Sequence, residues 1–183
     1  MSAAKFMGAA ARPLGWTGPI IACGAFLPAP GLAATIDLDF TIPRVPAMEY
    51  HRPYVVIWIE KPDHGGFKTL SIWQDKRKTG DDGKKYLSGL REWWRRGGES
   101  LELPADGISS ATRAPGPQAL TLSGRQTAGL SPGKYVLVVE AAREVGGQEA
   151  VHLPIEIPAN GKPAVFTASG VTELGAVQAS VKP

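Results

Sequence analysis

Short runs of alternating apolar and polar residues, separated by glycine- and proline-containing turns, constrain this chain more than any other feature. The run 34–43, ATIDLDFTIP, places Ile36, Leu38 and Phe40 on one face and polar side chains on the other. This period of two is typical of a strand with one buried face. The run 53–60, PYVVIWIE, is rich in β-branched and aromatic residues, which predicts a strand in the centre of a sheet.

Five further runs are bounded by turn residues and predict additional strands. Two connections, KPDHGGF at 61–67 and REVGGQE at 143–149, contain adjacent glycines and predict tight hairpin turns. The last of the five runs, PAVFTASG, is expected at a sheet edge. The five predicted strands cover 68–74, 118–124, 133–144, 148–158 and 163–170.

One segment, KKYLSGLREWWRR at 84–96, departs from the strand pattern because its apolar residues recur at helical spacing. Asp81-Asp82 before it and Gly97-Gly98 after it are start and stop signals. We therefore predict an amphipathic helix of about three turns. The predicted fold class is mainly β, an Ig-like β-sandwich with one amphipathic helix in an insertion. The apolar stripe of the helix comprises Tyr86, Leu87, Leu90, Trp93 and Trp94.

The segment 120–141, LTLSGRQTAGLSPGKYVLVVEA, supports the Ig-like assignment. Its spacing of Gly124, Gly129, Gly133 and Tyr135 resembles the Ig-like module of flagellar hook-cap and related secreted proteins. The resemblance concerns the fold only, because one fold hosts many functions.

The N-terminal segment predicts export. Lys5 and Arg12 form a basic start, an apolar stretch follows, and Gly31-Leu32-Ala33 offers small residues for cleavage after Ala33. We therefore expect a signal peptide at 1–33, a single Ig-like domain at 34–183 and a periplasmic location. A disordered tail is one alternative to the signal peptide. A second alternative is a lipoprotein, because Ile20-Ile21-Ala22-Cys23 resembles a lipobox.

Cleavage after Ala33 would change the charge of the chain. The 20 basic residues become 18 without Lys5 and Arg12, against 17 acidic residues, so the net charge falls from +3 to about +1. This near-neutral charge argues against nucleic acid as a partner. Cys23 is the single cysteine, so the mature domain is expected to use no disulfide and no thiolate chemistry.

Familiar catalytic patterns give little support for an enzyme. The three histidines, His51, His64 and His152, show no zinc-enzyme spacing, and no phosphate-binding glycine loop is present. Glu49, His51 and Arg52 cluster just before the predicted central strand. Glu49 and His51 leave metal handling open as a further alternative.

The segment 90–98, LREWWRRGG, is a candidate binding surface. Two adjacent tryptophans on a helix cannot both face the core, so Trp93 or Trp94 is expected to line a groove. Arg95 and its neighbours then offer donors for phosphate or carboxylate. The alternative is a helix that simply packs on the sheet and exposes its arginines.

The segment 106–112, DGISSAT, resembles the flavinylation motif D-x-x-[ST]-[GS]-A-T. FAD:protein FMN transferases recognise this motif outside the cytoplasm, and FMN becomes esterified to its last threonine. The resemblance implies FMN on Thr112, with Asp106, Ser109, Ser110 and Ala111 as recognition positions. Ser110 stands where glycine is usual. An ordinary Asp-Gly turn followed by a Ser/Thr loop remains the alternative.

Four segments together resemble DUF2271, a family of predicted periplasmic proteins: AMEYHRPYVVIWIE, LREWWRRGG, DGISSATRAPG and GKYVLVVEAAREVGGQE. Members of this family accompany PepSY-type membrane proteins and flavin transferases, in settings linked to iron uptake. The resemblance implies an FMN-bearing electron carrier and not an enzyme in its own right. We expect a tryptophan (Trp93, Trp94 or Trp73) to stack on the flavin and Arg95 with its neighbours to neutralise the phosphate. The alternative function is a non-redox binding module that uses the Trp/Arg helix surface.

Overall fold

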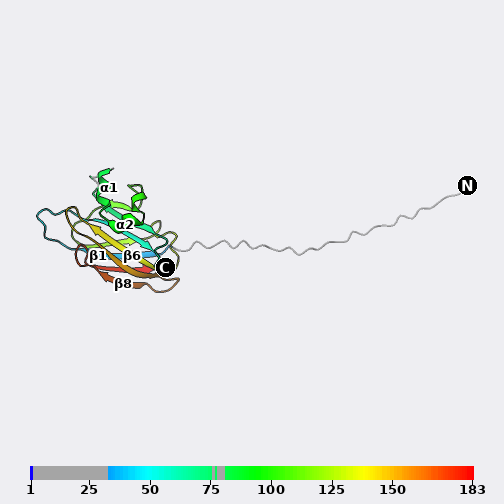
Figure 1. Cartoon of the computed structure of the whole chain (residues 1–183). Coiled ribbons are helices and arrows are strands. Elements are labelled where there is room, and N and C mark those ends of the chain that lie inside the picture. The colour runs from blue at the N-terminus through cyan, green and yellow to red at the C-terminus, as the bar shows by residue number, and fades with distance from the viewer. Residues whose placement is uncertain (2–32, 76, 78–80) are drawn as a thin grey trace. The chain divides into compact units, whose positions relative to one another are not determined.

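The computed structural model describes residues 1, 33–75, 77 and 81–183. The predicted signal segment, including Cys23, therefore lies almost entirely outside the described residues. The described residues from 33 onward form one compact unit, in which the strands make two sheets of four and five strands (Figure 1). The prediction of a mainly β fold is confirmed. Its Ig-like topology stays a prediction.

The four-stranded sheet has the strand order β5-β1-β9-β8, and all of its pairs are antiparallel. The alternation in β1 has the expected effect, because Ile36, Leu38, Phe40 and Ile42 are buried and the residues between them are more exposed. The strands are β1 (Thr35–Ile42), β5 (Gly116–Leu122), β8 (Ala164–Ser169) and β9 (Ala176–Lys182).

The five-stranded sheet has the order β4-β3-β2-β6-β7, and β4 pairs with β3 in parallel, whereas the other pairs are antiparallel. The predicted central strand is central, with neighbours on both sides, and the two predicted glycine turns close the β2–β3 and β6–β7 hairpins. The strands are β2 (Tyr54–Glu60), β3 (Lys68–Gln74), β4 (Ser109–Ala111), β6 (Gly133–Ala142) and β7 (Gln148–Ile157).

The strand β2 is buried along its whole length, and it is apolar up to Ile59 because both of its faces are covered. Val55, Ile57 and Ile59 join the core between the two sheets. The alternate residues, including Val56 and Trp58, join a second core under the helices. The domain thus has three layers, which are a four-stranded sheet, a five-stranded sheet and a helical insertion on the outer face of the latter (Figure 1).

The single predicted helix is wrong in one respect, because the structure has two short helices. They are α1 (Asp81–Leu87) and α2 (Arg91–Arg96), followed by a 3-10 turn at Gly98–Ser100. The predicted start and stop are confirmed. The interruption falls at Ser88-Gly89-Leu90, where glycine is a poor helix former and where Leu90 must reach the second core.

Two strands were not predicted. The first, β4, is three residues long and polar, so it has no periodicity to detect. The second, β9, buries Val177, Ala179 and Val181 in alternation, and this pattern is visible in the sequence. Since β9 lies between β1 and β8, it completes the four-stranded sheet.

Candidate functional site

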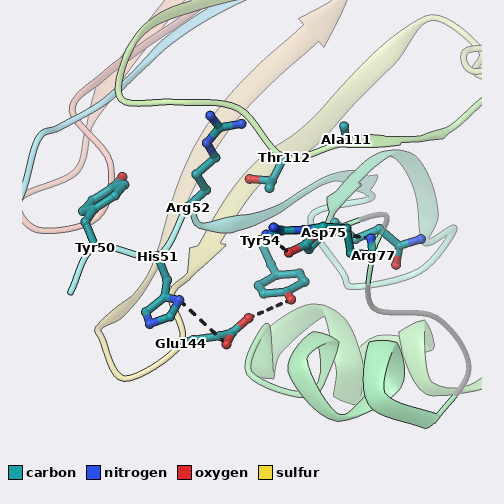
Figure 2. Close-up of a pocket in the computed structure, with 10 residues that line it drawn as sticks. Tyr50, His51, Arg52, Tyr54, Asp75, Arg77, Ala111, Thr112 and Glu144 are labelled. Atoms are coloured by element: carbon teal, nitrogen blue, oxygen red, sulfur yellow. Dashed lines mark hydrogen bonds and ion pairs between the residues drawn. The ribbon is translucent and has the colours of Figure 1, made fainter.

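A pocket of about 830 Å³ lies at one end of the five-stranded sheet (Figure 2). Strand direction explains why distant segments meet there. The start of β2, the end of β3 and the end of β6 coincide because β2 is antiparallel to both neighbours, and the end of β4 joins them because β4 runs parallel to β3. The lining residues are Tyr50, His51, Arg52, Tyr54, Gln74, Asp75, Arg77, Ala111, Thr112 and Glu144.

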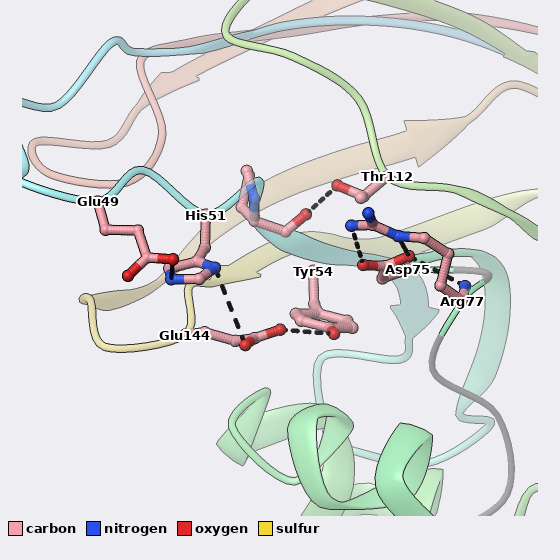
Figure 3. Close-up of polar contacts among 8 residues, drawn as sticks. Glu49, His51, Tyr54, Asp75, Arg77, Thr112 and Glu144 are labelled. Carbon is pink, nitrogen blue, oxygen red and sulfur yellow. Dashed lines mark hydrogen bonds and ion pairs between the residues drawn. The ribbon is translucent and has the colours of Figure 1, made fainter.

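Thr112 lines this pocket directly after β4. Its backbone N–H donates to the carbonyl of Gln74 over 3.0 Å, which continues the β3–β4 pairing by one residue. Its side-chain hydroxyl donates to the backbone carbonyl of Pro53 (Figure 3). The Thr112 hydroxyl is therefore half-buried and points into the wall formed by the start of β2.

The other motif positions surround Thr112 in the chain but differ in environment. The hydroxyl of Ser109 accepts the backbone N–H of Ala105 over 2.9 Å and closes the preceding turn. Asp106 is exposed in that turn. The hydroxyl oxygen of Ser110 is buried without a hydrogen-bond partner among the described atoms, so glycine at this position would leave no such orphan.

A chain of polar groups leads from the pocket to the surface (Figure 3). The Tyr54 hydroxyl donates to Glu144 Oε1 over 3.0 Å. His51 lies 3.9 Å from the other oxygen of Glu144 and 3.5 Å from Glu49. Burial, together with the bond to Glu144, raises the pKa of Tyr54. Tyr54 therefore stays protonated and acts as a hydrogen-bond donor.

Two arginines line the pocket and differ in their partners. The Arg77 guanidinium binds both oxygens of Asp75 over 3.0 and 2.8 Å, and this pairing raises its pKa. Arg52 is exposed, and no carboxylate of the described residues forms an ion pair with it. Sequence reasoning noted Arg52 only as a neighbour of Glu49 and His51, directly before the predicted central strand, and gave neither arginine a ligand-binding role.

The Trp/Arg segment lies elsewhere, and Trp93, Trp94 and Arg95 do not line the pocket of Thr112. Trp93 is fully buried, and its indole N–H donates to Thr69 over 2.9 Å. Trp73 is also buried. Neither ring has a face open to a ligand. Trp73 does pair with Ser110 of the motif in the β3–β4 ladder, but its ring is buried. Trp94 is half-buried, Arg95 is exposed, and neither lines the pocket of Thr112.

The helical insertion is fixed to the sheet by Glu140, which sequence reasoning missed. This carboxylate is fully buried and accepts the backbone N–H groups of Glu92 and Trp93 over 3.1 and 3.0 Å. Gln148 donates a third bond over 2.6 Å. Burial raises the pKa of Glu140 in spite of these donors. The only sequence feature that could have indicated a buried role for Glu140 is its position inside an apolar strand run.

The metal-handling alternative finds no site in the described part of the chain, where no group of three or more potential ligands gathers. The letters Gly129 to Gly133 match a serine nucleophile pattern, G-x-S-x-G. That pattern requires a sharp turn from a strand into a helix. Here Ser131 lies in a loop that leads into β6 instead.

Comparison with known protein families identifies the family of this chain. A family model described as "Predicted periplasmic protein (DUF2271)" matches residues 35–176, which include the pocket and every strand except β9 beyond its first residue. The chain belongs to the DUF2271 family. No curated protein and no solved structure matches the chain.

Membership of the DUF2271 family supports the expected periplasmic location. Over the described residues, no helix is long and apolar enough to cross a membrane. The family description gives no activity, so a function for its members has to be argued from the pocket.

Proposed function

We propose that this DUF2271 protein carries FMN as a phosphoester on Thr112 and exchanges electrons with a PepSY-type membrane partner, in a setting linked to iron assimilation. The observation that carries the proposal is the position of Thr112. The last threonine of a flavinylation-type motif lies in the wall of a pocket of about 830 Å³.

The residues of the pocket fit a flavin mononucleotide. Its volume lies within the range of about 300–1,000 Å³ that is typical of small-molecule sites. Arg52 supplies a cation for the phosphate, and Tyr50 supplies an aromatic side chain that is only half-buried. These two residues take the places that we expected Arg95 and a tryptophan to fill. The bound flavin would supply the redox chemistry, and the chain would hold and orient it.

The modification is a balanced group transfer from FAD. Thr112 Oγ1 forms a bond to the phosphorus on the FMN side of the FAD pyrophosphate, the P–O bond of the anhydride breaks, and AMP leaves. A threonine hydroxyl is a weak nucleophile, so the transferase has to supply the base that takes its proton and the metal ion that stabilises the phosphates. This chain is then the substrate of a modifying enzyme and needs no catalytic residues of its own.

The test is co-expression with an FAD:protein FMN transferase, followed by intact-mass measurement. The wild-type chain should gain the mass of one FMN minus one water, and Thr112→Ala should gain nothing. A wild-type chain without added mass, or a Thr112→Ala chain that still gains it, would end the proposal.

A non-redox binding module is the second candidate, and the exposed side of α2 favours it. Arg91 and Arg95 are exposed beside the half-buried Trp94, which suits an anionic ligand or partner. Arg96 is less available because it lies 3.5 Å from the buried Glu60. Protein that stays colourless in a host with the transferase, and that loses partner binding on Arg91→Ala and Arg95→Ala, would favour this function.

A further inference from the structure

The basic side chains of the pocket are not equally available to a ligand. Arg77 is already held by both oxygens of Asp75. His51 lies between the carboxylates of Glu49 and Glu144, at 3.5 and 3.9 Å. Arg52 lines the same pocket, is exposed, and forms no ion pair with any described carboxylate. Among the described basic side chains that line the pocket, Arg52 is therefore the one whose charge a bound anion can neutralise without displacing a partner.

Arg52 is also joined to Thr112 through a single residue. Pro53 follows Arg52 in the chain, and the carbonyl of Pro53 accepts the hydroxyl of Thr112. In Figure 2 the side chains of Arg52 and Thr112 lie on the same side of the pocket. Pro53 is buried directly before β2, so the backbone that carries Arg52 is held against the oxygen that would bear the phosphoester.

We propose that Arg52 is the phosphate-binding residue of this pocket and that the pocket selects phosphate esters of flavin-like aromatic compounds over the same compounds without phosphate. A guanidinium offers paired donors that match two phosphate oxygens. The inference deepens the proposed function and rests on it for the identity of the ligand. It does not need the covalent bond, because the same contact would select free FMN.

The experiment compares FMN with riboflavin, which has the same ring system and lacks the phosphate. Chain produced without a transferase is titrated into each flavin at low ionic strength, and binding is followed by quenching of flavin fluorescence. The wild-type chain should bind FMN about tenfold more tightly than riboflavin, which is the difference that one charge-assisted contact provides. Arg52→Ala should lose this preference and leave riboflavin affinity unchanged, and Arg52→Lys should keep part of it.

Arg113→Ala is the matched control. Arg113 neighbours Thr112 in sequence and carries the same charge, but its guanidinium lies over the Trp73 ring at 4.1 Å and does not line the pocket. This variant should keep the preference for FMN. Because Arg52 is exposed, Arg52→Ala should fold, and its urea midpoint should match that of the wild type.

The inference is overturned if the wild-type chain binds FMN and riboflavin equally, or if Arg52→Ala retains the preference. These outcomes are separate from the fate of the covalent proposal. A chain that prefers FMN through Arg52, yet gains no mass from a transferase, would refute attachment and leave the phosphate site in place. A chain that gains FMN from a transferase but binds free FMN and riboflavin equally would refute only the role of Arg52 and would leave the covalent proposal standing.

Discussion

The side-chain hydroxyl of Thr112 donates a hydrogen bond to the backbone carbonyl of Pro53, and so ties the end of β4 to the start of β2. A second bond joins the Thr112 N–H to Gln74 at the end of β3. The residue proposed for modification is thus attached to two strands. Thr112 is therefore held in place at the sheet edge. A transferase could bind a free loop without rearrangement, but these hydrogen bonds hold Thr112 against the sheet.

Replacing Thr112 should separate its chemical role from its structural one. Thr112→Val keeps the shape and removes the hydroxyl, so it should abolish FMN attachment. It should also lower the free energy of unfolding by about 1 kcal/mol, because the hydrogen bond to Pro53 is lost. Intact mass and urea unfolding measure the two effects. Thr112→Ser is the control and should retain both the attachment and most of the stability. A Thr112→Ser chain that gains no FMN would show that the hydroxyl alone does not suffice.

The attachments of Thr112 also predict that modification requires β4 to separate from β3. Gln74 and Ala111 are direct partners in this parallel pair, and both line the pocket. A disulfide between Gln74→Cys and Ala111→Cys, in a Cys23→Ser background, should hold the pair closed. Oxidised protein should gain FMN at least about tenfold more slowly than the same protein after reduction, because local opening limits access. Thiol titration confirms the disulfide, and intact mass follows the gain. Equal rates in the two redox states would contradict the requirement for opening.

The buried Glu140 predicts a pH dependence of stability with a definite sign. Burial raises its pKa in the folded state above the ordinary value of 4.5. The protonated form is therefore favoured by folding, and the related stability is present below pH 4.5 and is lost as the pH rises through the raised pKa. The wild-type chain should gain stability relative to Glu140→Gln as the pH falls from 7.5 to 4.5. Each unit of the pKa rise corresponds to about 1.4 kcal/mol. Urea unfolding of both chains over this pH range checks the prediction. A difference in unfolding free energy that stays constant with pH would contradict it.

Glu149 predicts the opposite sign. Partial burial would raise its pKa, but the backbone N–H groups of residues 171–174 bind its carboxylate at 2.6 to 3.0 Å and lower the pKa overall. Its contribution should therefore be present above pH 4.5 and be lost on acidification. Glu149→Gln should cost about 1.5–3 kcal/mol at neutral pH, as expected for charge-assisted hydrogen bonds. The cost should shrink toward pH 3 in urea unfolding, and a cost that grows on acidification would refute this account.

The sequence by itself determined the strands whose burial is periodic or complete. Alternation in 34–43 and the apolar run at 53–60 fixed β1 and β2, because a period of two exposes one face and a continuous run requires cover on both. The DUF2271 resemblance could also be read from short stretches of sequence. The same holds for two features that stay predictions, the export signal and the flavinylation-type motif that ends at Thr112. The same alternation of apolar and polar residues is present in β9 and would have been sufficient to predict that strand.

Only the tertiary structure decided what surrounds Thr112. The pocket combines residues 50–54, 74–77, 111–112 and 144, and no local pattern links segments so far apart in the chain. They meet because β2 lies between β3 and β6, and the direction of each strand brings one terminus of β2, β3, β4 and β6 to the same end of the sheet. The same sheet explains why Trp93 could not serve as a flavin platform. Its ring was needed to cover the outer face of β2, whereas Arg52, left exposed at the strand start, stayed available to a ligand.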